Sequence, residues 1–174
     1  MTATTRGGVP PGRGRTVVGV DDLEIRLLPF DAPEAQKMVT ELLADLGARY
    51  GGSGDDTPVD PREFDPPDGA FVVAFLGGEP VGCAGWRSHG TDGEVAELKR
   101  MYTAPAGRRR GVARAVLRAI EDDARSRGRK RVILECGSKQ PEAITFYQAN
   151  GYERIPDFGY YKDAPGVVSF GRTL

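Results

Sequence analysis

The sequence is poor in the residues that most often build metal sites and nucleophilic sites. Its 174 residues include two cysteines and one histidine. Two thiols and one imidazole are too few for the usual zinc ligand sets, and a lone histidine makes a Ser-His-Asp or Cys-His arrangement improbable. We therefore expect no metal, no disulfide framework and no covalent intermediate on a cysteine.

Long apolar runs are also missing. No segment approaches the roughly 20 apolar residues of a membrane-spanning helix, and the N-terminal segment lacks the apolar core of a secretory signal. Residues 1–20 are instead rich in Gly, Pro and Arg, which predicts a flexible N-terminal arm. Residues 21–174 are expected to form one cytoplasmic domain with reduced thiols and no membrane partner.

The chain has little net charge, but its charges are unevenly distributed. The formal net charge is −1 at pH 7, which argues against a general binder of nucleic acid or membrane surfaces. Between Lys99 and Arg131, however, the segment carries +9, so the remaining residues sum to −10. This basic segment offers only Tyr102 for stacking on bases. We therefore expect a local anion site and no nucleic-acid partner.

Hydrophobic periodicity predicts alternating strands and helices. The expected elements are a strand over 23–27, a helix from Pro33 that ends near Gly47, a long loop over 50–69, a hairpin of strands over 70–76 and 81–88, a strand over 95–103, a helix over 111–128, a strand over 131–135, a helix over 141–150, and strands over 152–155 and 167–174. One sheet with helices packed on it buries all the apolar faces. The strands over 95–103 and 131–135 are expected to be parallel, since a helix connects them.

The most informative stretch is RRRGVA at residues 108–113, between a predicted strand and a predicted helix. The first N–H groups of a helix lack partners, and the helix dipole places partial positive charge there. Three arginines at this end are unfavourable without an anion. Gly111 and Ala113 allow a ligand close to the backbone, so the R-x-x-G-x-A pattern predicts a pyrophosphate site. It matches neither the Walker loop nor the dinucleotide fingerprint.

Three motifs in this order resemble the GCN5-related N-acetyltransferase (GNAT) superfamily: ELKRMYTAP at 97–105, the R-x-x-G-x-A turn, and QPEAITFYQANGYERI at 140–155. The similarity covers about residues 22–174. It implies an α/β (α+β) fold with a mixed, mostly antiparallel sheet, helices on both faces and the order β-α-β-β-β-α-β-α-β-β. The fourth and fifth strands of this fold splay apart to admit acetyl-coenzyme A (acetyl-CoA).

The resemblance also implies an activity. Acetyl-CoA is the expected co-substrate, and its acetyl group would pass to a primary amine of a small molecule or peptide by direct attack in a ternary complex. A non-catalytic acyl-CoA-binding sensor on the same fold is the alternative. Such a sensor would keep the arginine turn but lose Glu97 and Tyr147, so their presence favours an enzyme. The acidic remainder of the chain hints at a cationic acceptor, and both a monomer and a homodimer stay open.

Glu97 and Tyr147 are the expected catalytic residues. Strand alternation predicts that residues 95, 97, 99, 101 and 103 share one face. The resemblance implies that Glu97 takes a proton from the amine, and we expect partial burial to raise its pKa. An ion pair between Glu97 and an arginine is the alternative. Tyr147 is implied to protonate the leaving sulfur, a nearly balanced transfer for ordinary thiol and phenol pKa values, and the alternative for Tyr147 is a core aromatic.

The coenzyme-binding residues are implied by the same resemblance. The backbone of Met101 and Thr103 would pair with the pantetheine arm, and the Met101 N–H would donate to the thioester oxygen. Gln140 stands where the family usually has asparagine, and Arg109 where glycine is commonest. The full expected set is Met101, Tyr102, Thr103, Arg108, Arg109, Arg110, Gly111, Val112, Ala113, Arg114, Gln140, Ala143 and Tyr147.

Overall fold

A mixed sheet with helices on both faces organises the chain. The computed structural model describes residues 17–19 and 22–174. The sheet has eight strands in the order β1-β2-β3-β4-β5-β6-β8-β7. Their bounds are β1 Val17–Gly19, β2 Leu23–Leu27, β3 Gly69–Leu76, β4 Glu79–His89, β5 Val95–Thr103, β6 Arg131–Gly137, β7 Glu153–Arg154 and β8 Val167–Thr173. From β2 onward, the order of strands and helices is the one expected.

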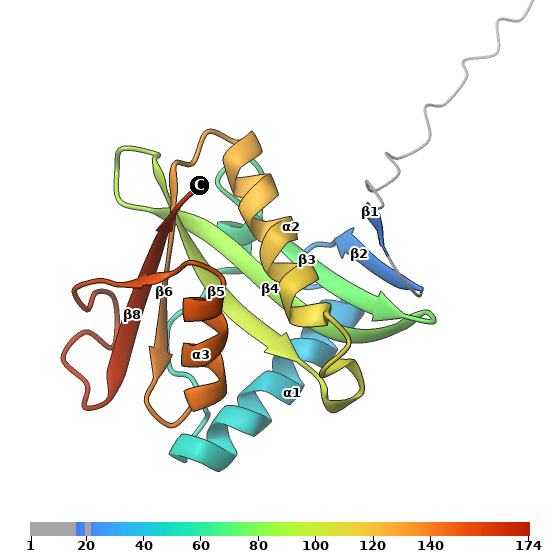
Figure 1. The fold of residues 1–174 in the computed structure, drawn as a ribbon, viewed down its shortest axis with the longest axis horizontal. Helices are drawn as coiled ribbons and strands as arrows, with labels where there is room; N and C mark the ends of the chain where they lie inside the picture. The colour runs from blue at the N-terminus through green and yellow to red at the C-terminus, as the bar shows by residue number, and fades with distance from the viewer. Residues whose placement is uncertain (1–16, 20–21) are drawn as a thin grey trace, which may run out of the picture.

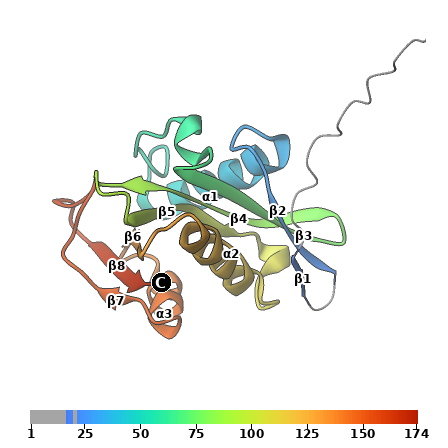
Figure 2. The ribbon, with the colours of Figure 1, turned by 90° about the horizontal axis from the view of Figure 1, so that it is seen from above.

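Three helices cover this sheet. Helix α1 (Pro33–Tyr50) lies on one face, and α2 (Val112–Ser126) and α3 (Pro141–Ala149) lie on the other (Figures 1 and 2). Two short 3₁₀ turns complete the fold, η1 (Pro61–Phe64) and η2 (Pro105–Gly107). In the part of the chain that the structure describes, none of the helices has the length and apolar character of a membrane span.

Each face of the sheet has its own hydrophobic core. Trp86, Leu98 and Val116 belong to the cluster beneath α2 and α3. Met38 and Phe71 belong to the cluster beneath α1. Because both faces are covered, β3 is a continuous apolar run rather than an alternating one.

Helix α1 continues beyond its expected end. Gly47 does not stop it, and the helix ends at Tyr50, where the N–H of Gly51 donates to the carbonyl of Gly47 at 2.8 Å. Gly51 has φ +86°, so the first glycine in the left-handed region, rather than the first glycine in the sequence, ends the helix. The extra turn brings Tyr50 to the edge of the candidate site.

The strands β5 and β6 are parallel, as expected, and they separate. They pair only over Val95–Glu97 with Arg131–Ile133. Beyond these pairs the two strands diverge, with α3 on one side of the opening (Figure 1). Strand β6 also runs to Gly137, two residues past its expected end.

A bulge in β5 overturns the expected alternation of its side chains. Cys83 of β4 is opposite Tyr102, but Gly85 is opposite Lys99, so β5 has one extra residue between these pairs. Arg100 occupies the bulge with φ +56°. As a result Met101 packs on the α2 and α3 side, while Glu97 pairs with Arg87, which turns toward η1. The expectation that residues 97, 99 and 101 share one face is therefore wrong from the bulge onward.

The N-terminal arm that we expected over residues 1–20 is described only in part. Residues 1–16 and 20–21 lie outside the described residues. Residues 17–19, assigned to the arm, instead form β1 and pair with β2, with Val17 opposite Ile25. The long loop over 50–69 contains η1, whose Phe64 is buried between the rings of Phe30 and Phe71.

Candidate active site

A cavity of about 380 Å³ lies where β5 and β6 separate. Its walls come from helices on opposite faces of the sheet, so the cavity crosses the sheet through the opening. The walls are Leu42, Leu46 and Tyr50 of α1, residues 51 and 54–56, Leu98–Met101 of β5, Leu134–Gly137 of β6, Gln140, Ala143 and Tyr147 at α3, Tyr161 and residues 164–166 before β8, and Val167, the first residue of β8.

The α3 side of the cavity holds four of the expected coenzyme-binding residues. Met101, Gln140, Ala143 and Tyr147 all line it. The Tyr147 hydroxyl donates to Met101 Sδ at 3.3 Å. Gln140 is the residue before the first turn of α3, as its position before a proline predicts, and its Oε1 accepts a hydrogen bond from the Tyr50 hydroxyl at 3.4 Å.

Tyr147 is both a core aromatic and a cavity wall. It is 7% exposed and packs edge-to-face against Phe146 and Tyr152. Burial raises the pKa of Tyr147 well above the ordinary phenol value. The phenol is therefore held protonated, and proton donation to a thiolate is less balanced than ordinary pKa values suggest.

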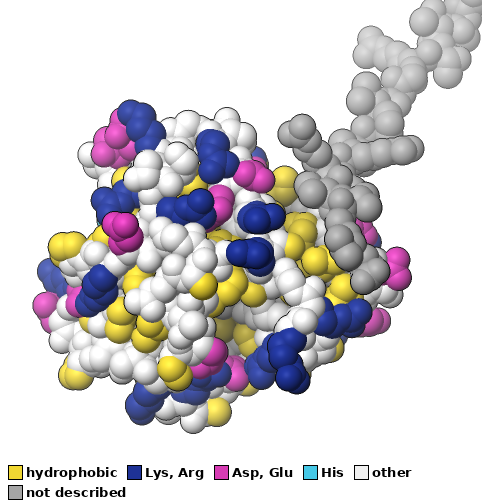
Figure 3. Space-filling view, viewed as in Figure 1, with side chains coloured by type: hydrophobic (Ala, Val, Ile, Leu, Met, Phe, Trp, Pro, Cys, Tyr) yellow, Lys and Arg dark blue, Asp and Glu magenta, His cyan; other side chains and the backbone are white. Residues whose placement is uncertain are grey.

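The arginine turn forms the start of α2, outside the cavity walls. Gly111 is the N-cap with φ +77°, without a side-chain cap and without an acidic residue in the first turn. The flanking side chains of Arg108, Arg109, Arg110 and Arg114 are exposed. Figure 3 shows Lys and Arg side chains gathered over this end of α2 and along the helix. The arrangement suits an anion, since both the helix dipole and the guanidinium groups are uncompensated by acids of the first turn.

Two arginines of this turn have distinct conformations. Arg109 has φ +58°, in the left-handed region that favours glycine, which explains why glycine is commonest there in the family it resembles. Arg108 turns back toward β5, and its Nε donates to the Thr103 carbonyl at 3.3 Å.

Four further expected coenzyme-binding residues, Val112, Ala113, Tyr102 and Thr103, do not line the cavity. Val112 is 1% exposed, so its side chain packs in the core and only its backbone can face a phosphate. Ala113 lies in the same first turn. Tyr102 packs against the cluster beneath α1. Thr103 ends β5.

Glu97 is a buried, ion-paired carboxylate. Its side chain is 5% exposed, with Arg87 Nε at 2.9 Å, Lys99 Nζ at 3.5 Å and His89 Nδ1 at 3.7 Å. Burial alone would raise its pKa, but Lys99 and Arg87 outweigh burial and hold the pKa of Glu97 below its ordinary value. The expected raised pKa is therefore wrong. Glu97 is also absent from the residues that line the cavity.

A second carboxylate, which the sequence did not point to, lies in the cavity wall. The side chain of Glu135 is 5% exposed, and its Oε1 accepts a hydrogen bond from the Tyr161 N–H at 3.3 Å. Its Oε2 has Lys99 Nζ at 3.9 Å and no hydrogen-bond partner among the described residues. Burial raises the pKa of Glu135. One feature of the sequence could have pointed to Glu135: it is an acidic residue toward the carboxyl end of a strand that was expected to run parallel to β5.

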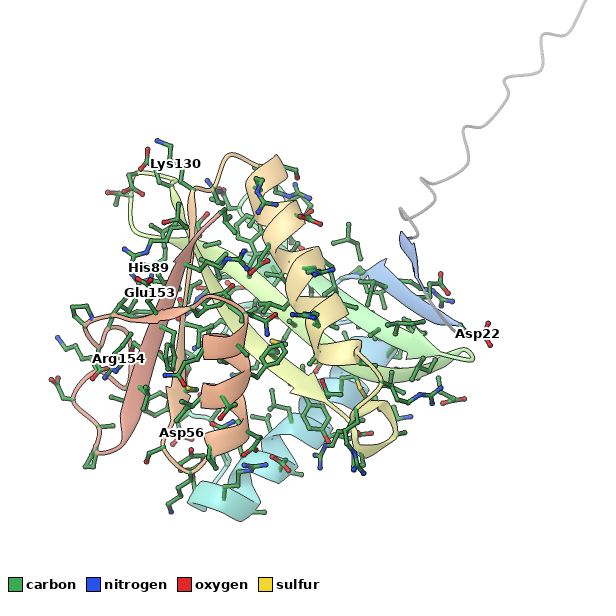
Figure 4. The ribbon with its side chains drawn as sticks, viewed as in Figure 1. Asp22, Asp56, His89, Lys130, Glu153 and Arg154 are labelled. Atoms are coloured by element: carbon green, nitrogen blue, oxygen red, sulfur yellow. The ribbon has the colours of Figure 1, made fainter. Side chains whose placement is uncertain are left out.

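Two loops meet beside this carboxylate through Tyr161. The Tyr161 hydroxyl donates to Asp55 Oδ1 at 3.1 Å and accepts from the Asp56 N–H at 2.7 Å. Asp55 also forms an ion pair with Arg100 of the bulge. Figure 4 labels Asp56, which lies beyond the C-terminal end of α1. The loop after α1 and the loop before β8 therefore form one wall of the cavity.

Neither cysteine has the environment of a nucleophile. Cys83 and Cys136 are free thiols. Burial raises the pKa of Cys136, which lines the cavity, to about 11 and that of Cys83 further still. Among residues 17–19 and 22–174, no group of three or more His, Cys, Asp and Glu side chains is arranged to hold a metal ion.

Comparison with known proteins gives one consistent result. The model of the acetyltransferase (GNAT) family matches residues 36–152. An "IAA acetyltransferase" of Azospirillum brasilense is 33% identical over 129 residues, 74% of this chain and 83% of that protein. The GNAT domain of PAT from S. lividans superposes with a TM-score of 0.70 at 22% identity, covering 87% of this chain and 90% of that one.

A further structure of the same fold was solved with a ligand. It is an aminoglycoside 6′-N-acetyltransferase complexed with coenzyme A, with a TM-score of 0.66, 16% identity, and coverage of 86% of this chain and 96% of that one. The family model covers more than half of the chain, including β5, the arginine turn and α3. The chain belongs to the GNAT family of acetyltransferases.

Proposed function

We propose that the protein transfers the acetyl group of acetyl-CoA to a primary amine of a small molecule or peptide, by direct attack within a ternary complex. The observation that carries this proposal is the cavity that crosses the sheet. It joins Tyr147 and Met101 on the α3 side to Glu135 and Lys99 on the side of α1. Two substrates can therefore meet from opposite faces of the sheet.

The donor side is the one near α2 and α3. The exposed arginines and free N–H groups at the start of α2 would bind the diphosphate of acetyl-CoA. The pantetheine arm would then follow the unpaired edge of β5 toward the opening, because β6 leaves that edge after Glu97. The Met101 N–H would donate to the thioester oxygen as negative charge develops there.

Tyr147 is placed to protonate the leaving sulfur. Its hydroxyl lies 3.3 Å from Met101 Sδ, at the cavity wall nearest the proposed thioester. The raised pKa of Tyr147 keeps the proton on the phenol until a thiolate forms. The same burial disfavours a charged thiolate, so proton transfer removes a charge from an apolar environment.

The experiment that tests this function combines calorimetry with a thiol-release assay. We expect acetyl-CoA to bind the protein alone, and coenzyme A to be released faster when a primary amine from a panel is added. Binding without amine-dependent release would favour the acyl-CoA sensor instead. Absence of any heat on adding acetyl-CoA would contradict both functions.

A further inference from the structure

The last turn of α1 is joined to the start of α3 by side-chain contacts that cross from one face of the sheet to the other. Arg49 Nη1 donates to the Lys139 carbonyl at 3.2 Å, and Lys139 Nζ donates to the Arg49 carbonyl at 3.2 Å. Arg49 also forms an ion pair with Glu142, in the first turn of α3. Figure 1 shows these two helix ends close together. They bound one end of the cavity, since Tyr50 and Gln140 both line it.

Tyr50 lies at the centre of these contacts. Its hydroxyl donates to Gln140 Oε1 at 3.4 Å, and Lys139 Nζ lies 5.4 Å from the centre of its ring. A Cβ at position 137 would collide with this hydroxyl, so the glycine at the end of β6 leaves the space that the hydroxyl occupies. Partial burial raises the pKa of Tyr50, so the phenol keeps its proton. Tyr50 is therefore a neutral donor toward Gln140.

The side-chain amide of Gln140 is oriented by two donors. Its Oε1 accepts from the Gly137 N–H at 3.4 Å as well as from the Tyr50 hydroxyl. Because a backbone N–H can only donate, the amide oxygen, and not the nitrogen, faces Gly137. Gln140 is the N-cap of α3, but its side chain makes no cap hydrogen bond. Its Nε2 has no partner among the described residues, so two N–H donors remain for a ligand in the cavity.

These N–H donors suit the pantetheine arm of the proposed acetyl donor. That arm carries two amide carbonyls, and each accepts hydrogen bonds. Gln140 shares the α3 side of the cavity with Ala143 and Tyr147, toward which the arm would run. Glutamine is one methylene longer than the asparagine that the family usually has here, and a longer side chain loses more rotamer freedom when one orientation is required. A contact that fixes the amide beforehand would reduce this cost.

We propose, as a refinement that rests on the proposed acetyl transfer, that Tyr50 is a positioning residue for the coenzyme: its hydroxyl holds Gln140 Oε1, so that the Nε2 donors face the pantetheine arm. Tyr50 acts through Gln140 and not on the thioester. Fixing the amide before the donor binds lowers the entropic cost of binding. The turn that α1 adds beyond Gly47 thereby contributes to the donor side, although α1 covers the opposite face of the sheet.

The first test is Tyr50→Phe, which removes only the hydroxyl. Tyr50 is 40% exposed, so the fold should be retained, as thermal unfolding would show. By calorimetry we expect the Kd for acetyl-CoA to rise about threefold to tenfold, the usual effect of one lost hydrogen bond. With saturating acetyl-CoA and the fastest amine of the panel, kcat should stay within about twofold, because Met101 and Tyr147 are unchanged.

A double-mutant cycle separates positioning from packing. Gln140→Ala should itself raise the Kd for acetyl-CoA, and adding Tyr50→Phe to it should change the Kd by less than about twofold. If Tyr50 only packs at the end of α1, the two losses of affinity would multiply, and the inference would be overturned. An unchanged Kd in Tyr50→Phe, with or without a raised KM for the amine, would overturn it as well.

Tyr160→Phe is the matched control. Tyr160 is 58% exposed in the loop before β8 and is not among the residues that line the cavity. Removing its hydroxyl should leave the Kd for acetyl-CoA and kcat at the wild-type values. A loss of affinity equal to that of Tyr50→Phe would contradict the assignment to Tyr50.

The second test needs no ligand. The side-chain amide signals of Gln140 are assigned by their loss in Gln140→Ala and followed by ¹⁵N NMR. We expect these signals to shift in Tyr50→Phe and to stay in place in Tyr160→Phe. Signals that do not shift in Tyr50→Phe would overturn the inference even if acetyl transfer is shown. Failure of the wild-type protein to bind acetyl-CoA would overturn the proposed function, while the contact between Tyr50 and Gln140 would still be measurable.

Discussion

At the scale of single residues, Lys99 lies between two carboxylates and serves them unequally. Its Nζ is 3.5 Å from Glu97 Oε1 and 3.9 Å from Glu135 Oε2. Glu97 has Arg87 in addition, at 2.9 Å, and its pKa is lowered. Glu135 has no second cation among the described residues, and its pKa is raised. Two chemically identical groups in one cluster therefore have opposite pKa shifts.

Removing the charge of Glu97 should make Glu135 more acidic. In Glu97→Gln, the negative charge that raises the pKa of Glu135 is lost, and Lys99 keeps Glu135 as its remaining carboxylate partner. Both changes favour the ionised form of Glu135. In protein carrying ¹³C-labelled glutamate, the carboxyl resonance of Glu135 should therefore titrate at lower pH in Glu97→Gln than in the wild-type protein. A titration midpoint that is unchanged, or that moves to higher pH, would show that the charge of Glu97 does not raise the pKa of Glu135.

Tyr147→Phe separates the acid role from packing. The hydroxyl has one hydrogen-bond partner in the described residues, Met101 Sδ, so its loss should cost no more than about 1 kcal/mol of folding free energy. We expect turnover to fall about 100-fold, whereas the affinity for acetyl-CoA should change little. Single-turnover kinetics and calorimetry measure the two quantities. Unchanged turnover would leave Tyr147 as a core aromatic only.

At the scale of elements, two left-handed residues shape the site. Arg100 forms the bulge of β5, and Gly111 begins α2. The bulge turns Met101 to the α3 side, while Glu97 stays on the other side. The side chains of β5 therefore face both the donor side and the acceptor side of the sheet. Gly111 leaves the start of α2 open to an anion.

Gly111→Ala tests the helix start. The position has φ +77° but no atom within 4 Å of an added Cβ, so the cost is backbone strain of about 1–2 kcal/mol. Relief of this strain would displace the first N–H groups, and we expect acetyl-CoA affinity to fall severalfold. Gly128→Ala is the control, because it has φ +81° and equally open space just past the other end of α2. Calorimetry should show weaker binding for Gly111→Ala alone, although thermal unfolding shows both variants destabilised.

The same elements show what the sequence can and cannot predict. The β3–β4 hairpin was predictable, since Gly77 and Gly78, both with positive φ, stand between two apolar runs. The bulge was not, because an arginine carries no signal for the left-handed region. The end of α1 was misplaced because Gly47 and Gly51 are equivalent in the sequence and differ only in φ.

At the scale of the whole molecule, the cavity depends on segments that are distant in the chain. Tyr50, Lys99, Glu135 and Tyr161 all line it, but no motif spans them. The donor residues were predictable because they are consecutive in a turn and a helix. The buried carboxylate of Glu135 in the cavity wall was not predictable, because its burial and its distance to Lys99 arise only when β5 and β6 separate.

Acetyl-CoA should stabilise the whole fold if the start of α2 binds its diphosphate. At about 100 times its Kd, the ligand adds about 2.7 kcal/mol to the free energy of unfolding, which corresponds to a rise in Tm of about 5–10 °C for a domain of this size. In Arg110→Ala the rise should be smaller at the same concentration, since an exposed guanidinium next to the helix start is lost. Arg125→Ala removes another exposed arginine, near the opposite end of α2, so its rise should match that of the wild-type protein. Because the attraction is between charges, raising the salt concentration should reduce the rise for the wild-type protein more than for Arg110→Ala. An equal loss in both variants would show that net charge, and not the arginine turn, determines coenzyme binding.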